Sequence, residues 1–494
     1  MSGPCVKMSG QIALEDEGPH EECAVFGIFG ADEASAHTTL GLHAMQHRGQ
    51  EAAGVVCFDG KHFHAQRGLG EVGVVLNKEE VMARLVGSSA IGHNRYATTG
   101  DGAVHNIQPL FAEFAFGGFA IAHNGNLTNA RSLRRRLVEG GSLFQSTTDT
   151  EVIVHLIARS VRQSLVDRLV DALHQVEGAY SLVALSRKKL IGVRDPLGIR
   201  PLVLGQLGDA YILASETCAL DIIGADFVRD VAPGELIVID EDGVQSLFPF
   251  PKQPSRFCVF EYIYFARPDS LMEGKSVYEA RKRIGAELAR ESSPEGGVDV
   301  VVPVPDSGVP AAIGFASAAG VPFEYGIIRN HYVGRTFIEP TAQIRHLGVK
   351  LKHNANRSMV EGKRIVLVDD SIVRGTTSRK IVEMMRHAGA AEIHMRISSP
   401  PTAYPCYYGI DTPERSELMA ARLDVAGMAK EIGVDSLAFI SIDGLYRAMG
   451  QERRDGGCPA YCDACFTGDY PVRLVDRDRG AAGKRSEESM LRLG

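Results

Sequence analysis

The chain has 494 residues, of which 45% are hydrophobic and 23% are charged, as in ordinary globular proteins and unlike disordered or fibrous chains. At about 150 residues per domain, this length predicts roughly three structural units. Lys and Arg number 53 against 61 Asp and Glu, and the formal net charge of −8 argues against a general nucleic-acid-binding surface. Nine cysteines are the unusual feature, because an odd number in a long chain does not indicate a disulfide scaffold.

We expect neither a membrane-spanning segment nor a secretory signal. No stretch reaches the run of ~20 apolar residues that a membrane helix needs. Residues 1–22 contain one Lys and five acidic residues and have no apolar core. The sequence therefore predicts a cytoplasmic protein with reduced thiols, in which each cysteine has a chemical role or is buried as packing.

Short strands and few helices are expected from Cys23 to about Phe250. Apolar or alternating runs such as CAVFGIFG, AAGVVCFDG and YSLVALS are separated by Gly, Asp and Asn. Helices are predicted over 34–46 and 150–175. Apolar residues of the second recur at helical spacing: Val152, Val154, Leu156, Ile157 and Val161. This pattern predicts a layered α+β domain with helices packed on sheets.

A change of pattern marks the predicted domain boundary. Residues 248–255 contain three prolines, and beyond them apolar β-branched strands alternate with amphipathic helices, as in α/β domains with a parallel sheet. The charged, Gly-rich end of the chain is expected to be flexible. The predicted division is a leader over 1–22, a first domain over 23–252, a second over 253–470 and a tail over 471–494.

The most informative stretch of the second domain runs from Arg364 to Thr377. A buried strand over 365–368 ends at Asp369 and Asp370, where ligands bind in open α/β sheets. A hydroxyl-rich loop then opens a helix that we expect to begin near Ser378. A helix N-terminus favours phosphate, and paired carboxylates suit ribose hydroxyls or Mg²⁺. The alternative, a strand cap followed by an ordinary glycine turn, leaves this order of features unexplained.

A second predicted strand, over 298–304, runs into the sequence Pro-Asp-Ser-Gly at 305–308. Between the two strands, residues 329–357 carry six Lys or Arg against one acid, Glu339. Such an excess in an acidic protein suits a lid over a polyanion, although a solvated basic face is the alternative.

The order of strand, Asp-Asp, loop and helix resembles the phosphoribosyl diphosphate (PRPP) motif of type I phosphoribosyltransferases. The resemblance implies that Asp369 and Asp370 contact the ribose and, together with Ser307, bind Mg²⁺. The further residues that it assigns to PRPP are Asp306, Ser307, Arg335, Arg374, Gly375, Thr376, Thr377 and Ser378.

Cys23 begins the first convincing strand, and two interpretations of it stay open. A buried strand cysteine is usually inert packing. If residues 1–22 were removed, however, its own α-amine, with a pKa near ~7.7–8.0, could act as its general base. The sequence alone does not show cleavage.

Five motifs occur in a fixed order: CAVFG, LHAMQHRGQE, HNRYATTG, HNGNL and TTDTE. Together they resemble the glutaminase domain of class II amidotransferases, an α+β N-terminal-nucleophile fold with αββα layers. The resemblance implies that Cys23 is the nucleophile, and that Arg95 and Asp149 bind the α-carboxylate and α-ammonium of glutamine. It also implies an oxyanion hole made by Asn124 and Gly125, whereas Arg48 is expected to hold the local backbone.

The cysteines near the C-terminus suggest a metal group. Cys462 and Cys465 form a C-x-x-C, and Cys258 and Cys406 stand alone. C-x-x-C occurs in zinc, redox and iron–sulfur sites, and a closed metal site needs four thiolates whereas a redox pair needs only two.

From Cys23 to about Tyr470, the chain resembles the iron–sulfur-bearing branch of the glutamine PRPP amidotransferase (amidophosphoribosyltransferase) family. The resemblance implies a [4Fe–4S] cluster, with zinc as second choice, on Cys258, Cys406, Cys462 and Cys465. It implies glutamine hydrolysis and passage of the ammonia through an internal channel to C1 of PRPP. The products of this pentosyl transfer, the first committed step of purine synthesis, are 5-phosphoribosylamine, glutamate and diphosphate. A weaker implication is that Tyr96, Tyr264 and Tyr332 line the channel.

The family also implies purine nucleotides as feedback inhibitors and a homo-oligomer, dimer or tetramer. Three alternatives remain: an amidotransferase with another acceptor, such as a sugar phosphate; a PRPP-sensing regulator without catalysis; and an iron–sulfur redox carrier. Cys5 lies in the leader, and the cysteines left for packing or as spare thiols are Cys57, Cys218 and Cys458.

Overall fold

The structure is a computed structural model that describes residues 23–96, 104–330 and 353–477. Contacts among these residues divide the chain into two compact units. One unit holds the described residues of 285–402 and 416–440, and the other those of 23–284, 403–415 and 441–477. This grouping differs from the predicted division at 252/253, because three later pieces of the chain join the first unit of the sequence. A grouping by contacts does not test where a domain begins or ends, so the predicted boundaries stay a prediction.

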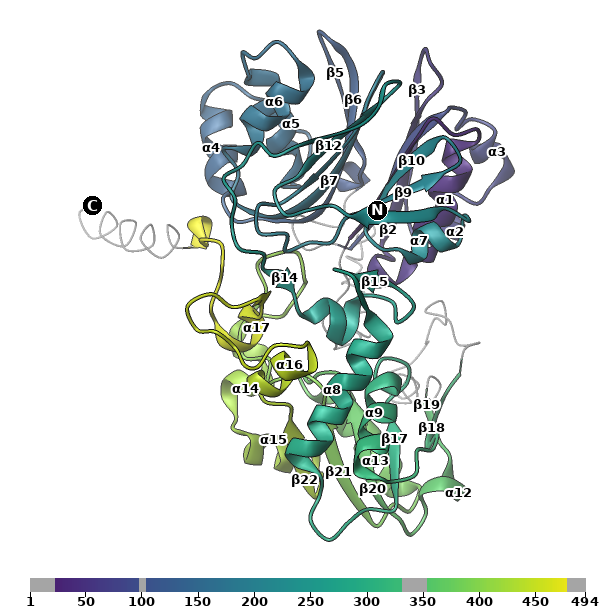
Figure 1. Cartoon of the computed structure of the whole chain (residues 1–494), viewed down its shortest axis with the longest axis vertical. Coiled ribbons are helices and arrows are strands. Elements are labelled where there is room, and N and C mark those ends of the chain that lie inside the picture. Colours follow the sequence, from purple (N-terminus) through teal and green to yellow (C-terminus); the bar gives the residue numbers. More distant parts are fainter. Residues whose placement is uncertain (1–22, 97–103, 331–352, 478–494) are drawn as a thin grey trace, which may run out of the picture. The chain divides into compact units, whose positions relative to one another are not determined.

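The larger unit is built on two antiparallel sheets (Figure 1). The seven-stranded sheet runs in the order β11 (Asp226–Asp230), β9 (Val203–Leu207), β10 (Ala210–Ala214), β1 (Ala24–Phe29), β4 (Ser89–Arg95), β2 (Ala52–Phe58) and β3 (Phe63–Leu69). The six-stranded sheet runs in the order β13 (Gly243–Leu247), β12 (Leu236–Asp240), β8 (Leu190–Arg194), β7 (Gly178–Ser186), β6 (Gly117–Leu127) and β5 (Leu110–Phe114).

Helices cover the outer face of each sheet (Figure 1). Those on the seven-stranded sheet are α1 (Ala34–Ala44), α2 (Val72–Val75), α3 (Glu79–Met82) and α7 (Cys218–Asp221). Those on the six-stranded sheet are α4 (Ala130–Glu139), α5 (Thr150–Arg159) and α6 (Leu165–Leu173). The short turns η1 (Gln46–Arg48) and η2 (Val104–Asn106) complete this part.

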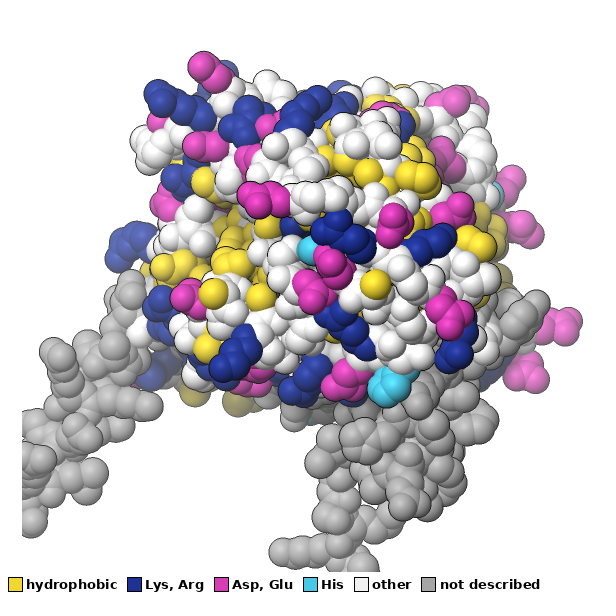
Figure 2. Space-filling model, turned by 90° about the horizontal axis from the view of Figure 1, so that it is seen from below, with side chains coloured by type: hydrophobic (Ala, Val, Ile, Leu, Met, Phe, Trp, Pro, Cys, Tyr) yellow, Lys and Arg dark blue, Asp and Glu magenta, His cyan; other side chains and the backbone are white. Residues whose placement is uncertain are grey.

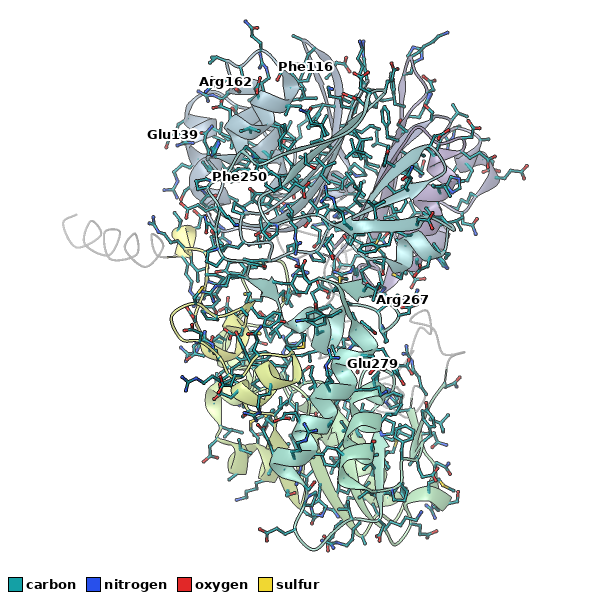
Figure 3. All side chains as sticks on the ribbon, in the orientation of Figure 1. Phe116, Glu139, Arg162, Phe250, Arg267 and Glu279 are labelled. Carbon is teal, nitrogen blue, oxygen red and sulfur yellow. The ribbon has the colours of Figure 1, made fainter. Side chains whose placement is uncertain are left out.

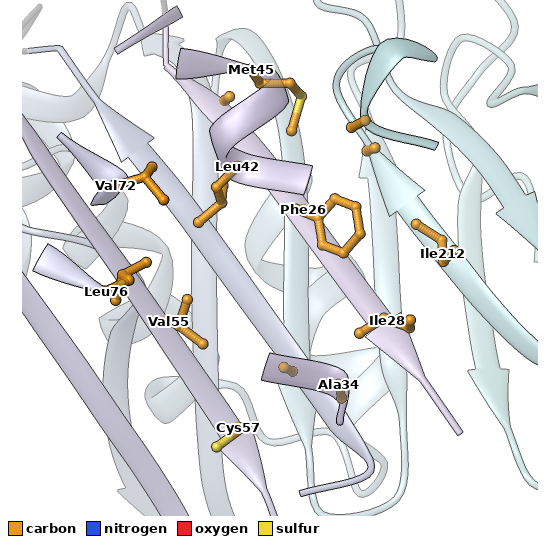
Figure 4. Packing of buried hydrophobic residues seen from close by; sticks show 14 of the residues in the cluster. Phe26, Ile28, Ala34, Leu42, Met45, Val55, Cys57, Val72, Leu76 and Ile212 are labelled. Carbon is orange, nitrogen blue, oxygen red and sulfur yellow. The ribbon is translucent and has the colours of Figure 1, made fainter. Parts of the chain in front are cut away.

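Alternation along the strands separates three cores and explains the layers. In β1, Phe26 and Ile28 pack under α1 with Leu42, as Figure 4 shows, whereas Val25 points the other way. There Val25 meets Val183 of the second sheet, whose opposite face packs on α4 to α6. Because side chains alternate between faces with a period of two, central strands such as β1 contribute to two cores. The predicted αββα layering is confirmed.

The single helix predicted over 150–175 is wrong, because the chain forms α5 and α6 there instead. The side chain of Ser164 accepts a hydrogen bond from the N–H of Asp167 at 3.1 Å and starts a new helix. Val161, which helical spacing placed on the apolar face, lies in the connection and is 92% exposed. The spacing of apolar residues continues across the break, so periodicity did not reveal it.

The smaller unit contains a four-stranded parallel sheet, which confirms the predicted α/β class. Its order is β17 (Val300–Pro303), β20 (Arg364–Asp369), β21 (Glu392–Ile397) and β22 (Ser436–Phe439). Its other elements are α9 (Val309–Ala319), α12 (Arg357–Val360), α13 (Thr376–His387), η4 (Arg415–Glu417), α14 (Met419–Arg422), α15 (Val425–Ile432) and the hairpin of β18 (Ile327–Arg329) with β19 (His353–Ala355).

The remaining elements are short, apart from α8 (Val277–Ser292). The short ones are β14 (Phe257–Cys258), the π-helix η3 (Glu261–Phe265), β15 (Leu271–Met272), β16 (Lys275–Ser276), α16 (Ile442–Ala448), β23 (Tyr461–Cys462) and α17 (Ala464–Thr467). Among the described helices, none has the length and apolar character needed to span a membrane. On the face shown in Figure 2, acidic and basic side chains are interspersed, without a large area of one sign.

A buried network of charges ties η1 to the π-helix η3 within the larger unit. Arg48 contacts Glu216 through Nε and donates from Nη2 to Glu261 Oε2 at 2.6 Å, and all three side chains are 0% exposed. Arg200 Nη2 donates to the other oxygen of Glu261 at 2.5 Å. The N–H of Arg267, labelled in Figure 3, donates to Glu216 at 2.9 Å. Burial opposes ionisation of Glu216, but Arg48 holds the pKa of this carboxyl well below its usual value.

Removal of Arg48 should therefore destabilise the fold. Arg48→Ala leaves two buried carboxylates short of a partner, which should cost about 3–5 kcal/mol of unfolding free energy. For a unit of this size, we expect the Tm to fall by roughly 10 °C in a thermal melt. The control is Arg187→Ala, since Arg187 pairs with Glu113 at the surface, where both side chains are more than half exposed, and such pairs contribute about 0–1 kcal/mol. Equal shifts for the two variants would contradict the assignment.

Candidate active sites

The proposed nucleophile lies at the end of the central strand pair of the seven-stranded sheet. Cys23 directly precedes β1, which pairs antiparallel with β4, and β4 ends at Arg95. Its side chain is buried, and Sγ donates to the carbonyl oxygen of Tyr96 at 3.4 Å. Burial raises the pKa of the Cys23 thiol to about 11, against an opposing effect of the Arg95 charge. The thiol is thus neutral at pH 7 and needs a base to react.

Asn124 and Gly125 lie on β6, opposite Ser181 and Tyr180 of β7. The Asn124 amide donates to Ser215 Oγ at 3.4 Å, and the same hydroxyl accepts from the N–H of Val25 at 3.0 Å. Ser215 therefore links the amide to the strand that follows Cys23. Asn124 Oδ1 is buried and has no hydrogen-bond partner within the part of the chain that the structure describes.

Only glycine fits at position 125. Its φ is +142°, and a Cβ there would lie 2.1 Å from the carbonyl oxygen of Ala179 on β7. The HNGNL motif therefore needs its glycine for a close approach between neighbouring strands, independently of any chemical role.

Asp149 is a buried carboxylate at the start of α5. It accepts from the N–H of Leu127 at 2.9 Å, and its Oδ1 lies 3.6 Å from Nδ1 of His123. Burial would raise the pKa of Asp149, but His123 and the hydrogen bonds outweigh it and lower this pKa. The charges of Arg95 and Asp149 both act on the pKa of the Cys23 thiol, so the structure brings the three predicted residues into one site.

The second site lies where β17 and β20 end side by side. The N–H of Val304 donates to the carbonyl of Val368 at 2.8 Å, which continues the pairing beyond β17. Ser307 Oγ donates to Asp370 Oδ1 at 2.6 Å, so the two predicted loops meet. Burial, together with the neighbouring charge of Asp370, raises the pKa of Asp369 well above its usual value. A cation bound between these two buried carboxyl groups would favour their ionised forms.

Asp306 forms an exposed ion pair with Arg329, an arginine that begins the predicted lid. Arg335, Tyr332 and most of this lid lie outside the described residues. Tyr264 lies in the π-helix η3, and Tyr96 follows β4.

The predicted phosphate loop does open a helix, but α13 begins at Thr376, two residues earlier than expected. Gly375 precedes it with φ +83°, and a Cβ there would lie 2.5 Å from Cε of Met419. Arg374 donates to Glu417 at 2.9 Å. Thr376, Thr377 and Ser378 thus form the first turn, whose N–H groups have no acceptor within the helix and can bind an anion.

The structure gathers the four predicted ligand cysteines from three segments of the larger unit. Cys258 and Cys462 lie opposite each other in the parallel pair of β14 and β23. The N–H groups of Ala403 and Tyr404 both donate to the carbonyl of Cys465 at 3.1 Å, which brings in the segment of Cys406. All four thiols are free. Burial, and then the charges of the other three, raises the pKa of Cys465 well above its usual value.

Across the described residues, no three His, Cys, Asp or Glu side chains are grouped closely enough to hold a metal ion. An iron–sulfur cluster places iron and sulfide atoms between the thiolates and therefore accepts a wider arrangement. The donor set fits such a cluster by its chemistry: four free thiols, of which Cys258 and Cys462 are buried and Cys406 and Cys465 are partly buried.

Ser215 is the site residue that sequence reasoning missed. It follows β10, far from the motifs, and nothing in its spacing indicates a role. A hydroxyl among the buried residues at a strand end was the only available signal, because buried polar groups need partners.

Comparison with known proteins agrees with the two kinds of domain that the sequence predicted. Residues 93–221 match the model of a glutamine amidotransferase domain, and residues 273–398 that of a phosphoribosyl transferase domain. The chain is 59% identical over 478 residues to the amidophosphoribosyltransferase of Rhizobium etli, with 96% of each chain covered. It is 49% identical over 464 residues to that of Bacillus subtilis, covering 94% of this chain and 97% of the relative.

A solved structure of glutamine PRPP amidotransferase from B. subtilis, complexed with ADP and GMP, matches with a TM-score of 0.86 at 48% identity, covering 92% of this chain and 98% of that one. Fold and sites thus define a glutamine amidotransferase joined to a phosphoribosyltransferase. The chain belongs to the amidophosphoribosyltransferase family, as its motifs predicted.

The buried thiol of Cys23 makes a prediction about reactivity. In molecules whose Glu22–Cys23 bond is intact, alkylation of Cys23 by iodoacetamide should be slow at pH 7 and rise about tenfold per pH unit to pH 9.5 without a plateau, because the thiol has a pKa of about 11. Peptide mass spectrometry measures the rate, with the exposed Cys458 as an internal control that reacts at pH 7. A plateau below pH 9 would contradict the effect of burial.

Proposed function

We propose that this protein hydrolyses glutamine and transfers the ammonia to C1 of PRPP, forming 5-phosphoribosylamine, glutamate and diphosphate in the first committed step of purine synthesis. The observation that carries the proposal is that one chain holds both sets of site residues and matches amidophosphoribosyltransferases over 96% of its length.

The glutaminase reaction begins with activation of Cys23. Removal of residues 1–22 gives Cys23 a free α-amine, which takes the proton that burial keeps on the thiol. Sγ then attacks the side-chain amide carbon of glutamine, ammonia leaves, and water hydrolyses the thioester to glutamate. Arg95 and Asp149 hold the α-carboxylate and α-ammonium of the substrate by charge.

The Asn124 amide and the Gly125 N–H donate to the oxyanion that forms in this attack. Loss of one such donor typically lowers kcat by ~10²–10³. Oδ1 of Asn124 has no hydrogen-bond partner among the described residues. This supports the role, because a buried amide with an unused hydrogen-bonding group can bind a ligand. Turning this amide by 180° places its oxygen toward the Ser215 hydroxyl and frees its N–H₂ for the oxyanion.

In the second site, the first turn of α13 binds the 5-phosphate, with Arg374 and Gly375 shaping the loop, and Asp369 and Asp370 bind the ribose hydroxyls. Ser307 and Arg335 bind the diphosphate, and Asp306 is assigned to the same PRPP-binding loop, where it pairs with Arg329. Asp369, Asp370 and Ser307 would hold Mg²⁺, which when bound neutralises the charge on the departing diphosphate. Ammonia attacks C1 as the C1–O bond to diphosphate breaks.

Ammonia is proposed to travel inside the protein, past Tyr264, Tyr96 and Tyr332, so that it is not lost as ammonium. Purine nucleotides are proposed as feedback ligands, because the B. subtilis relative was solved with ADP and GMP. A cytoplasmic homo-oligomer, dimer or tetramer, completes the proposal. A PRPP-sensing regulator or a redox carrier would have no use for Cys23, Arg95 and Asp149 together in one buried site.

Glutamate release with and without PRPP tests this function. Protein purified anaerobically and assayed with Mg²⁺ should release glutamate faster when PRPP is present. Cys23→Ala should lose glutamine-dependent activity by at least ~10³-fold and keep phosphoribosylamine formation from ammonium chloride, because only the glutaminase uses the thiol. Cys458→Ala, at an exposed cysteine, is the matched control. No stimulation by PRPP would refute the function, and an active sample that begins at Met1 would refute the processing step.

Cys258, Cys406, Cys462 and Cys465 would hold a [4Fe–4S] cluster, whose contribution is a cross-link between distant segments. Anaerobic protein should contain about four iron and four sulfide per chain, and Cys465→Ser should lose most of both. Cys458→Ser, seven residues earlier, should retain them. Iron and sulfide analysis and visible absorption give the readout, and an equal loss in both variants would contradict the ligand assignment.

A further inference from the structure

The backbone of Gly409 touches the backbone of Gly125. A Cβ on Gly409, whose φ is +115°, would lie 2.9 Å from Cα and 3.1 Å from the carbonyl carbon of Gly125. One residue further along β6, Asn126 Nδ2 donates to the carbonyl of Tyr407 at 3.0 Å. Two successive residues of the strand that carries the oxyanion hole thus contact the segment 403–415.

Gly125 is confined on its other side as well. Its Cα faces the carbonyl of Ala179 so closely that no side chain fits. Gly125 is therefore held between β7 and the segment 403–415, which contacts its Cα and carbonyl group. The direction of its N–H, which an oxyanion must meet within a few tenths of an ångström, depends on both.

The segment itself is fastened at several points. The N–H of Cys406 donates to Oγ1 of Thr412 at 2.7 Å. The hydroxyl of Tyr408 donates to the carbonyl of Val472 at 2.8 Å, and that of Tyr470 donates to the carbonyl of Pro405 at 2.6 Å. These hydrogen bonds hold the segment 403–415 in place, so it can fix the position of Gly125, which it contacts.

We propose that Gly409 is a positioning residue for the oxyanion hole, and that the segment 403–415 completes the glutaminase site from the C-terminal third of the chain. The inference rests on the proposed glutaminase activity. Cys23, Arg95 and Asp149, from the N-terminal part of the chain, supply the nucleophile and the substrate-binding charges. Gly409 and Tyr407 hold the strand that stabilises the tetrahedral intermediate.

The test is Gly409→Ala, whose added methyl group must displace Gly125. We expect kcat for glutamine hydrolysis to fall by about 10²-fold, as for loss of an oxyanion donor, while KM for glutamine stays within about twofold. Inhibition by glutamate γ-semialdehyde, which forms a tetrahedral adduct with the Cys23 thiol, should weaken by a similar factor, because this adduct uses the hole and glutamine in its ground state does not. Phosphoribosylamine formation from ammonium chloride should be unchanged.

Gly141→Ala is the matched control, since Gly141 also has a positive φ, +86°, but nothing lies within 4 Å of its added Cβ. Asn126→Ala adds no atoms and removes the bond to Tyr407, so it decides the matter if Gly409→Ala fails to fold; its kcat should fall several-fold with KM unchanged. An unchanged kcat and semialdehyde affinity, a loss matched by Gly141→Ala, or a rise in KM alone would each overturn the inference. Absence of glutaminase activity from the unaltered protein would instead overturn the proposed function.

Discussion

Two buried carboxylates that share one guanidinium constrain much of the larger unit. Glu216 and Glu261 are fully buried and both pair with Arg48, while His47 is a second partner of Glu216. A buried charge without a partner is costly, so the π-helix that carries Glu261 has to pack against η1. Arg200 satisfies the second oxygen of Glu261, and the N–H of Cys258 donates to the carbonyl of Ile199 beside it. These contacts explain why the residues directly after 252, up to 284, belong to the larger unit.

Both sites lie at strand ends, where backbone pairing stops and side chains converge. Pairing of β1 with β4 brings Cys23 to Arg95, and the parallel pairing of β17 with β20 brings Ser307 to Asp370. In each site, burial disfavours the charged form of one side chain, the Cys23 thiolate in the first and the Asp369 carboxylate in the second. That side chain therefore needs a partner. The proposed partner is a base for Cys23 and a cation for Asp369.

The C-terminal third of the chain is interleaved with the glutaminase. The segment 403–415 carries Cys406 on one side of its turn and Gly409 against Gly125 on the other. Asp476 reaches further and accepts from the N–H groups of Arg131 and Ser132 at the start of α4, within the tail that was expected to be flexible from residue 471. The glutaminase and the C-terminal segments are therefore parts of one packed body.

Short motifs and local patterns in the sequence were enough to predict the family, the layered and parallel folds, and the motifs around Cys23, Gly125 and Asp369. Periodicity and short motifs record interactions between residues close in the chain. They placed the start of α13 two residues late, and they missed the capping serine, Ser164, that splits one apolar pattern into two helices. Tertiary structure alone decided the partners of Arg48, the bridging role of Ser215 and the contact of Gly409 with Gly125. Those contacts join residues more than 80 positions apart in the chain. They involve carboxylates, hydroxyls and glycine backbone, and no regular spacing in the sequence marks such contacts in advance.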